Sequence, residues 1–468
     1  MSFAHPFQKY RPKPPPTMNR RKFVSSIAVA GAAVAAGSRL FASDSKPRLR
    51  VGVIGCGWYG GVNLAIFQRN APIHVVSLCD PNSNKLANLA KQSAETQTET
   101  PATFADFRKM LAHAPLDVVI VTTPDHWHAL PAIAAMQAGA DLYLEKPISH
   151  DVIEGEALVA AARKYGRVVQ VNTQRRGNPI YAEAREKYIA SGRIGTIGLA
   201  ETYSYLPGRP TGLIPELAVP AHLDYELWTG PAPMIPFNDR LEVRGWRSWM
   251  EFGNGQIGDL GVHMLDKVRF LLGLGWPQSV QSTGGILADK PPYSSNISDT
   301  QHSVFKYPGL EVAWEHRTWG ASPIPQRHWS DQWGARIIGT GGTLNMTMLE
   351  YAFTPAGGAA REGRHMLSKS GDLENIDFNT QGNVYREVED LHVLDFLKAR
   401  ETRGRPVADI EQGHISTAMC SLANLSLELG RPIAYDPKSR TVPGDPTATA
   451  RLTRPYRAPW IHPTPETV

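Results

Sequence analysis

Residues 48–70 read RLRVGVIGCGWYGGVNLAIFQRN and combine three features in a fixed order. The apolar run over 49–54 predicts a buried strand, the glycines after it predict a tight turn, and the following segment predicts a helix. The first glycine permits the turn, the second lets the backbone approach a diphosphate, and the third lets the helix pack on the strand. Free N–H groups at the helix N-terminus would hold that diphosphate. The predicted dinucleotide-binding residues of this stretch are Gly55, Gly57, Trp58, Tyr59 and Gly60.

A second strand, HVVSLCD, ends at Asp80, twenty residues after Gly60. A carboxylate in this place accepts hydrogen bonds from the adenosine ribose and repels a 2′-phosphate. The spacing therefore favours NAD over NADP as the cofactor. Asp80 is followed by Pro81, so an ordinary turn is the alternative interpretation.

Strand and helix patterns continue to alternate after Asp80. The segment 117–123 predicts a strand, 126–139 a helix, 141–147 a strand, 152–166 a helix and 168–172 a strand. Such alternation predicts an α/β fold with a doubly wound parallel sheet, in which ligands bind beyond the carboxyl ends of the strands. We therefore place a dinucleotide-binding domain of the Rossmann type at residues 44–172.

The sequence MNRRKFVSS at 18–26 precedes a mildly apolar run over 27–36. That run is too short to span a bilayer, which takes roughly 20 apolar residues. Two adjacent arginines before such a run are typical of a twin-arginine signal, which exports folded proteins. We expect residues 1–43 to be an N-terminal extension and signal peptide, and the protein to be periplasmic or otherwise extracytoplasmic. An ordinary N-terminal helix or a membrane anchor is the alternative.

The basic character of the whole chain comes from this N-terminal segment. The formal net charge is +5, but residues 1–43 hold seven basic residues and no acidic one, which leaves 42 basic against 44 acidic residues. The sequence therefore gives no support to a nucleic-acid partner. Two of the three cysteines, Cys56 and Cys79, fall in the predicted dinucleotide domain, which argues against a disulfide framework.

The motifs VTTPDHWH at 121–128 and EKP at 145–147 complete a set that resembles the Gfo/Idh/MocA family, the glucose–fructose oxidoreductases and inositol dehydrogenases. The resemblance runs from about residue 48 to about residue 437. It also rests on QRR at 174–176, SGRIGTIG at 191–198, GQIGDLGVHMLD at 255–266 and IIGTGGTL at 337–344.

The resemblance implies that a second α/β domain with a large, open, mostly antiparallel sheet follows the Rossmann domain. We assign this substrate-binding and oligomerisation domain to 173–440 and a C-terminal tail to 441–468. In the family, one face of the sheet commonly forms a dimer or tetramer contact. We therefore expect a homodimer or homotetramer.

Three residues are predicted to carry the chemistry. The resemblance places Lys146 beside the nicotinamide ribose and the reacting hydroxyl, whose pKa its charge would lower. Asp259 and His263 are four residues apart, so a helix would present both on one face. A histidine can take the proton of an alcohol while hydride leaves the same carbon, and a carboxylate can orient it or contact the substrate. A helix cap and a core histidine are the alternative interpretation.

The remaining site predictions follow from the same resemblance. No metal is expected, because Asp259 and His263 lack an evident third ligand, and His126 and His128 point in different directions on a helix. The further cofactor-binding residues are Thr123, Pro124, His128, Glu145, Lys146 and Gln174. The predicted substrate-binding residues are Lys146, Arg176, Asp259 and His263. For Arg176, a salt bridge without a role in binding is the alternative interpretation.

These predictions indicate an exported NAD-dependent oxidoreductase that acts on CH–OH groups of a saccharide, cyclitol or glycoside. Because no pool of free dinucleotide is expected outside the cytoplasm, the cofactor would be tightly held and recycled internally. An NAD-dependent glycoside hydrolase that uses transient oxidation and elimination is the alternative, and a non-catalytic sugar- or nucleotide-binding protein is a third possibility. The expected partners are a carbohydrate-like small molecule and the twin-arginine export machinery.

Overall fold

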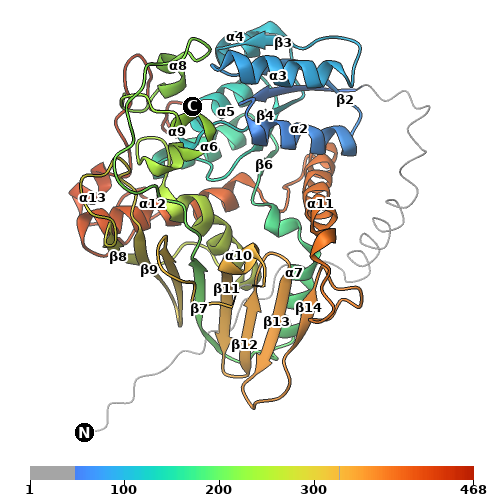
Figure 1. The fold of residues 1–468 in the computed structure, drawn as a ribbon, viewed down its shortest axis with the longest axis vertical. Coiled ribbons are helices and arrows are strands. Elements are labelled where there is room, and N and C mark those ends of the chain that lie inside the picture. The colour runs from blue at the N-terminus through green and yellow to red at the C-terminus, as the bar shows by residue number, and fades with distance from the viewer. Residues whose placement is uncertain (1–47, 326) are drawn as a thin grey trace.

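The computed structural model describes residues 48–325 and 327–468 (Figure 1). The predicted twin-arginine signal at 1–43 lies outside these residues. Among the described residues, no helix combines the length and the hydrophobicity that a membrane crossing requires.

The first domain is built on a six-stranded parallel sheet with the strand order β3-β2-β1-β4-β5-β6. Its strands are β1 (Leu49–Ile54), β2 (Ile73–Cys79), β3 (Ala102–Phe104), β4 (Val118–Val121), β5 (Asp141–Leu144) and β6 (Val169–Val171). Its helices are α2 (Trp58–Asn70), α3 (Ser83–Ala94), α4 (Phe107–His113), α5 (Ala129–Gln137) and α6 (Val152–Lys164). The strand order reverses between β1 and β4, and this is where such sheets bind ligands. The predicted Rossmann architecture is confirmed.

The central strands are largely apolar because both faces of the sheet are covered. All four residues of β4 and the last four of β1 are buried, as expected for a parallel sheet between two helical layers. The segment predicted as one helix over 126–139 is divided into a 3-10 turn, η1 (Asp125–Trp127), and α5. All three cysteines are free and buried, in agreement with the expectation that no disulfide framework exists.

The second domain contains an eight-stranded sheet with the order β14-β13-β12-β11-β7-β10-β9-β8. Only the β7–β10 pair is parallel, so the sheet is mostly antiparallel, as predicted. Its strands are β7 (Ile197–Ser204), β8 (Ser279–Gly285), β9 (Thr300–Tyr307), β10 (Leu310–Arg317), β11 (Trp333–Gly339), β12 (Gly342–Met346), β13 (Glu350–Pro355) and β14 (Glu362–His365).

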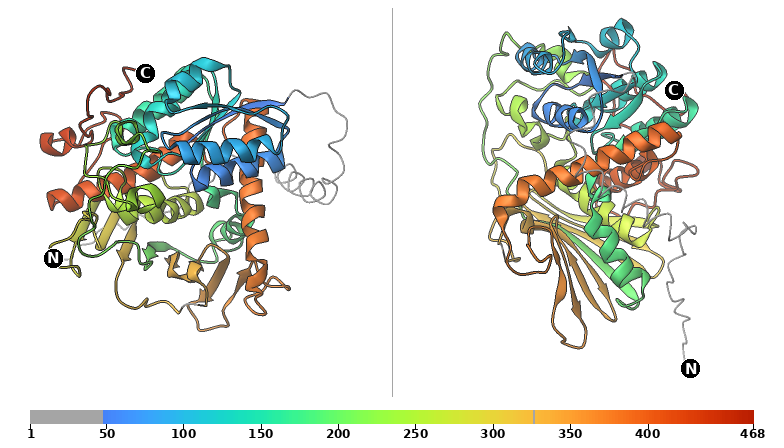
Figure 2. Two further views of the ribbon diagram at one scale, coloured as in Figure 1. Left: turned by 45° about the horizontal axis from the view of Figure 1, so that its top comes forward. Right: turned by 90° about the vertical axis from the view of Figure 1, so that its right-hand side faces the viewer.

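Helices cover one face of this sheet, and one of them returns to the first domain (Figure 2). The helices of this part are α7 (Pro179–Ala184), α8 (Tyr225–Thr229), α9 (Arg240–Val243), α10 (Val262–Leu272), α11 (Gln381–Thr402), α12 (Ile410–Leu429) and α13 (Pro446–Ala450). Phe396 of α11 packs edge-on against Phe67 and Tyr143 of the first domain. The two domains therefore share a continuous interior.

The segment predicted as a C-terminal tail is fixed to the first domain. The indole of Trp460 lies 4.7 Å from that of Trp127 and 6.4 Å from the ring of Phe107, centroid to centroid. Arg454 and Tyr456 both donate hydrogen bonds to the buried carboxylate of Glu154. This part of the chain supports α6 and the loops beside it.

A buried ion pair joins the chain after β6 to α10. Arg176 donates to both carboxylate oxygens of Asp266, at 2.8 and 2.7 Å, and the two side chains are 6% and 0% exposed. The hydroxyl of Ser416 on α12 also donates to Asp266, at 2.8 Å. The pair therefore ties three elements together in the interior.

We expect Arg176→Met to lower the free energy of unfolding by about 3–5 kcal/mol, because it leaves the Asp266 carboxylate buried without its partner. Chemical denaturation followed by tryptophan fluorescence measures this loss. Arg451→Gln is the matched control, since its ion pair with Glu428 is about half exposed on both sides and is expected to contribute less than about 1 kcal/mol. Equal losses in the two variants would contradict the structural role of Arg176.

Candidate active site

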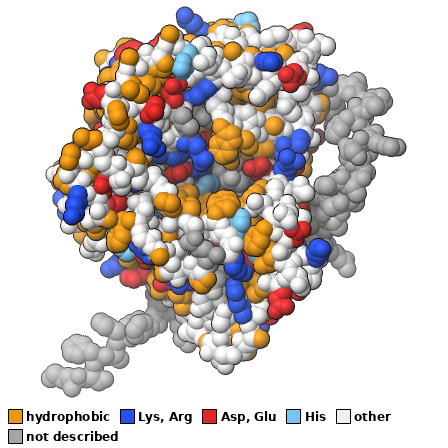
Figure 3. Space-filling view, in the orientation of Figure 1, with side chains coloured by type: hydrophobic (Ala, Val, Ile, Leu, Met, Phe, Trp, Pro, Cys, Tyr) orange, Lys and Arg blue, Asp and Glu red, His pale blue; other side chains and the backbone are white. Residues whose placement is uncertain are grey.

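A cavity of about 940 Å³ lies where the carboxyl ends of the Rossmann strands face the second domain. Figure 3 shows a hollow in the middle of this face, bordered by lysine and arginine side chains. Residues 206–250, which we call the strap, form part of its wall and contain a small aromatic core of their own. Nearly all predicted site residues line this cavity; Gly60 and Arg176 do not.

The glycine turn has the geometry that a diphosphate requires. Gly55 has a φ of +98°, a conformation that favours glycine, and a Cβ on Gly60 would lie 2.1 Å from the carbonyl oxygen of Gly55. A Cβ on Gly57 would meet nothing within 4 Å, so the backbone there faces open space at the N-terminus of α2. Gly55 and Gly60 shape the turn, and Gly57 leaves room for a ligand to approach the backbone.

Asp80 lines this cavity at the end of β2. Its carboxylate accepts hydrogen bonds from the backbone N–H groups of Cys56 and Asn82, both at 2.8 Å. Burial raises the pKa of this carboxyl, while those two hydrogen bonds and the charge of Lys85 act in the opposite direction. The side chain is thus oriented in the position that the sequence predicts for ribose recognition.

The strap is attached to the first domain beside Asp80. Glu242 of the strap accepts a hydrogen bond from Asn82 Nδ2 at 2.5 Å, and its backbone carbonyl accepts one from Lys85 Nζ at 2.8 Å. His222 of the strap also contacts the Glu242 carboxylate, at 3.1 Å. These contacts close the cavity over the end of β2.

His128 and Glu145 position the neighbouring strand ends. His128 Nδ1 lies 2.5 Å from the carbonyl oxygen of Pro147, and Nε2 lies 2.9 Å from that of Thr123, so the ring joins the ends of β4 and β5. The carboxylate of Glu145 accepts hydrogen bonds from the side-chain amides of Asn63 and Asn172. Both residues line the cavity but are occupied in holding its wall.

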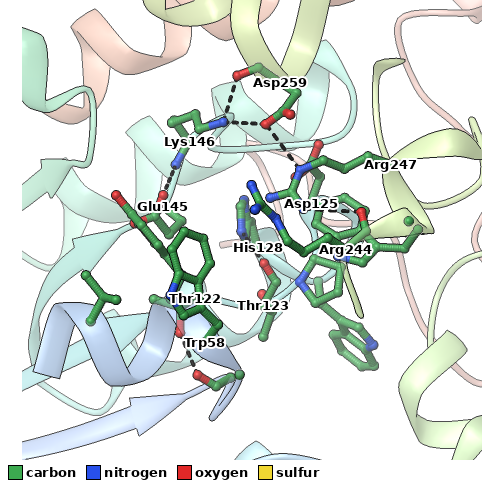
Figure 4. Close-up of a pocket in the computed structure, with 18 of the residues that line it drawn as sticks. Trp58, Thr122, Thr123, Asp125, His128, Glu145, Lys146, Arg244, Arg247 and Asp259 are labelled. Atoms are coloured by element: carbon green, nitrogen blue, oxygen red, sulfur yellow. Dashed lines mark hydrogen bonds and ion pairs between the residues drawn. The ribbon is translucent and has the colours of Figure 1, made fainter. Parts of the chain in front are cut away.

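Lys146 and Asp259 meet across the two domains (Figure 4). Lys146 Nζ donates to the Asp259 carboxylate at 2.8 Å and to its backbone carbonyl at 2.7 Å. Arg247 of the strap forms a second ion pair with the same carboxylate, at 3.1 Å. Burial alone would raise the pKa of Asp259, but the charges of Lys146 and Arg247 outweigh it and hold this pKa below its usual range.

His263 completes the predicted catalytic set. Asp259 lies in a π-helical turn, η5 (Ile257–Gly261), which leads directly into α10, and His263 is the second residue of α10. The imidazole lines the cavity and is almost fully buried. Burial and the charges of Lys146 and Arg175 lower its pKa well below the usual value. At neutral pH the ring is therefore uncharged.

The three residues of QRR turn in different directions because they lie in a 3-10 turn, η2 (Gln174–Gly177). Gln174 lines the cavity and donates a hydrogen bond to Tyr59 Oη at 3.3 Å. Arg175 also lines it, whereas Arg176, predicted to bind substrate, points into the interior toward Asp266. Neighbouring residues of a 3-10 helix are about a third of a turn apart, so Arg175 and Arg176 point in different directions, and the cavity residue Arg175 was not among the predicted site residues.

Two further cavity residues were not identified from the sequence. Asp125 follows the predicted Thr-Pro pair, and Arg247 lies in the strap, where no motif marks it. His126, considered as a metal ligand with His128, instead places Nε2 3.0 Å from the carbonyl oxygen of Trp228. In the part of the chain that the structure describes, the group Asp151, Glu154 and His462 has metal-ligand spacing, but Arg454 and Tyr456 already donate to it.

Comparison with known proteins agrees with this arrangement. Residues 49–173 match the model of an oxidoreductase family described as an NAD-binding Rossmann fold, GFO_IDH_MocA. Residues 205–284 match the model of the C-terminal alpha/beta domain of the same family. The chain is therefore similar to the GFO/IDH/MocA oxidoreductases in these two segments.

Sequence identity to individual relatives is low. The chain is 29% identical to the levoglucosan dehydrogenase of Pseudarthrobacter phenanthrenivorans over 232 residues, which are 48% of this chain and 51% of that one. It is 23% identical to the 2,7-anhydro-N-acetylneuraminate hydratase of Mediterraneibacter gnavus over 308 residues, 64% of this chain and 68% of that one. The match thus spans about half the length of the dehydrogenase.

Solved structures share the fold over a greater length. A levoglucosan dehydrogenase in complex with NADH and levoglucosan has a TM-score of 0.61 at 20% sequence identity. The match covers 83% of this chain and 99% of that chain. At this level of identity the likeness is one of fold.

The buried carboxyl of Asp125 makes the free energy of unfolding of the protein depend on pH. Burial raises its pKa to about 7 in the folded protein, whereas an unfolded aspartate has a pKa of about 3.9. The unfolded chain therefore ionises first, and the contribution of Asp125 to the free energy of unfolding falls as pH rises from about 4 to about 7.

We expect Asp125→Asn to become more stable relative to the wild type over this pH range and the difference to level off above it. Thermal unfolding of the cofactor-free proteins at a series of pH values measures the difference. Glu374→Gln, at an exposed carboxylate, is the control and should show no such trend. A constant difference for Asp125→Asn would contradict the raised pKa.

Proposed function

We propose that this protein is an NAD-dependent oxidoreductase that acts on a CH–OH or keto group of a saccharide-like substrate. The observation that carries this is the meeting of Lys146, Asp259 and His263 in the cavity that begins at the glycine turn. The family match over 49–173 and the open backbone at Gly57 support NAD as the cofactor. The named relatives, a levoglucosan dehydrogenase and a sialic-acid-derivative hydratase, support a carbohydrate-like substrate.

The chemistry follows from the protonation states of the site. Bound NAD⁺ supplies the hydride acceptor. His263 is neutral and takes the hydroxyl proton of the substrate as the C–H bond of the same carbon gives up its hydride. Lys146 stabilises the negative charge that develops on the substrate oxygen. Asp259 keeps the ammonium oriented by accepting its hydrogen bond at 2.8 Å. Reduction of a carbonyl uses the same residues in reverse.

We further propose that the cofactor stays bound between turnovers and that the protein is exported in the folded, loaded state. The strap supports retention, because Glu242 accepts hydrogen bonds from Asn82 and Lys85 and so fastens the strap beside Asp80, over the cofactor end of the cavity. Retention requires each reduction of NAD⁺ to be followed by its re-oxidation on a second carbonyl or on the same molecule. The hydratase relative, whose name describes addition of water, is consistent with a cycle that has no net oxidation.

We expect protein exported by a twin-arginine-competent host to contain stoichiometric NAD that sugars reduce and a second carbonyl re-oxidises. Reduced-nicotinamide absorbance before denaturation and dinucleotide release after it measure both properties. Lys146→Met and His263→Asn should retain NAD but slow its reduction by about 10²–10⁴-fold. The exposed control Lys91→Met should retain NAD and reduce it at the wild-type rate. Release of an aglycone or monosaccharide in place of a keto-sugar would favour the hydrolase. If no sugar reduces the bound NAD, the oxidoreductase function is refuted.

We expect Glu242→Ala to speed NAD release about tenfold, since it removes the side-chain hydrogen bond to Asn82 and the contact with His222. Rapid dilution of the loaded protein into an enzyme that consumes free NAD measures the rate. Glu216→Ala removes the same charge from an exposed position of the strap and should leave the rate unchanged. Equal rates for wild type and Glu242→Ala would show that the strap does not retain the cofactor.

A further inference from the structure

Arg175 differs from the other arginines of the site because its charge is buried without a partner. The residue is 4% exposed and lines the cavity. Among the described residues, no hydrogen bond or ion pair engages its guanidinium, and its Nε is a buried donor without an acceptor. Burying an unpaired cation is costly, so such a group is expected to have a partner that enters from outside the chain.

The guanidinium of Arg175 lies against an aromatic side chain. The group lies over the ring of Trp333, with Cζ 4.6 Å from the ring centroid. Stacking occupies one face of the guanidinium and leaves its N–H edge free, which is the edge that binds a carboxylate through two hydrogen bonds. The wall around it is aromatic and apolar, with Trp329, Met348 and Tyr385.

No acidic side chain of the cavity neutralises Arg175. The negative charge of Glu389, on α11, acts to raise the pKa of Arg175, but the two side chains form no ion pair within 4.0 Å. Asp259 is already shared between Lys146 and Arg247. Among the described residues, the charge of Arg175 therefore has no ion-pair partner in the cavity.

We propose that Arg175 binds a carboxylate of the substrate, and that the substrate is an acidic saccharide such as a uronic or aldonic acid. This rests on the oxidoreductase function proposed above and specifies its substrate class. The sugar ring would lie against the aromatic wall, with its carboxylate on Arg175 and its reacting CH–OH beside Lys146 and His263. Arg175 Cζ lies 4.6 Å and the His263 ring 6.0 Å from the ring centroid of Trp333, so one small molecule can reach both.

The test uses loaded enzyme and pairs of sugars that differ only in charge. D-glucuronate and D-galacturonate are compared with their methyl esters, which keep the shape and lose the charge. We expect at least one acid to reduce the bound NAD with a kcat/KM about 10- to 100-fold above that of its ester. Arg175→Met should abolish this preference, so that acid and ester react at similar rates, and should leave the NAD content unchanged. Arg175→Lys keeps the positive charge but lacks the paired N–H donors of a guanidinium, so it should retain part of the preference for the acid.

Stability provides a second readout that a merely structural arginine would not match. Because the guanidinium has no partner to lose, Arg175→Met should leave the melting temperature of the substrate-free protein unchanged or raise it. The neighbouring Arg176→Met, which breaks a buried ion pair, should lower it. Addition of the preferred acid should raise the melting temperature of the wild type and fail to do so in Arg175→Met.

The two proposals fail in different ways. If an acid binds through Arg175 by the melting-temperature readout but no sugar reduces the cofactor, the oxidoreductase function is refuted and the carboxylate site stands. If neutral sugars are oxidised and no acid of the panel binds or reacts better than its ester, the carboxylate site is refuted and the oxidoreductase stands. Loss of bound NAD in Arg175→Met would also refute it, because Arg175 would then serve the cofactor.

Discussion

The active site depends on one contact between the domains, the ion pair of Lys146 with Asp259. Lys146 follows a strand of the Rossmann sheet, and Asp259 lies in the π-helical turn before α10. Each side chain is largely removed from water, and each charge is tolerated there because the other is present. The pair therefore fixes both the position of the ammonium in the cavity and the approach of the helix that carries His263.

The Rossmann domain could be predicted from the sequence because its signals are local. The glycines of 55–60 and the apolar strands carry their structural reason within a few residues of chain. Lys146, Asp259 and His263 were also found, but only through the resemblance to a family, since a lysine after a strand and a histidine on a helix are ordinary features. The mostly antiparallel second sheet was reached in the same way.

Other parts could not be predicted because their meaning arises from distant segments. Arg175 and Arg176 are adjacent and chemically alike, yet Asp266 pairs with one and the cavity receives the other. Nothing in the order of the residues says which way a 3-10 turn will present them. Arg247 gains its role from Asp259, and Asp125 gains its raised pKa from the depth at which the second domain buries it.

The packing of Trp460 against Trp127 and Phe107 has a consequence for the order of folding. Phe107 and Trp127 line the cavity, but the ring that supports them is synthesised more than three hundred residues later. During translation the first domain can form its sheet early, while this side of its binding pocket lacks support until the last segment arrives. The dinucleotide site is thus completed late, and a protein that holds the dinucleotide in the complete site is one in which the segment around Trp460 has already packed against the first domain.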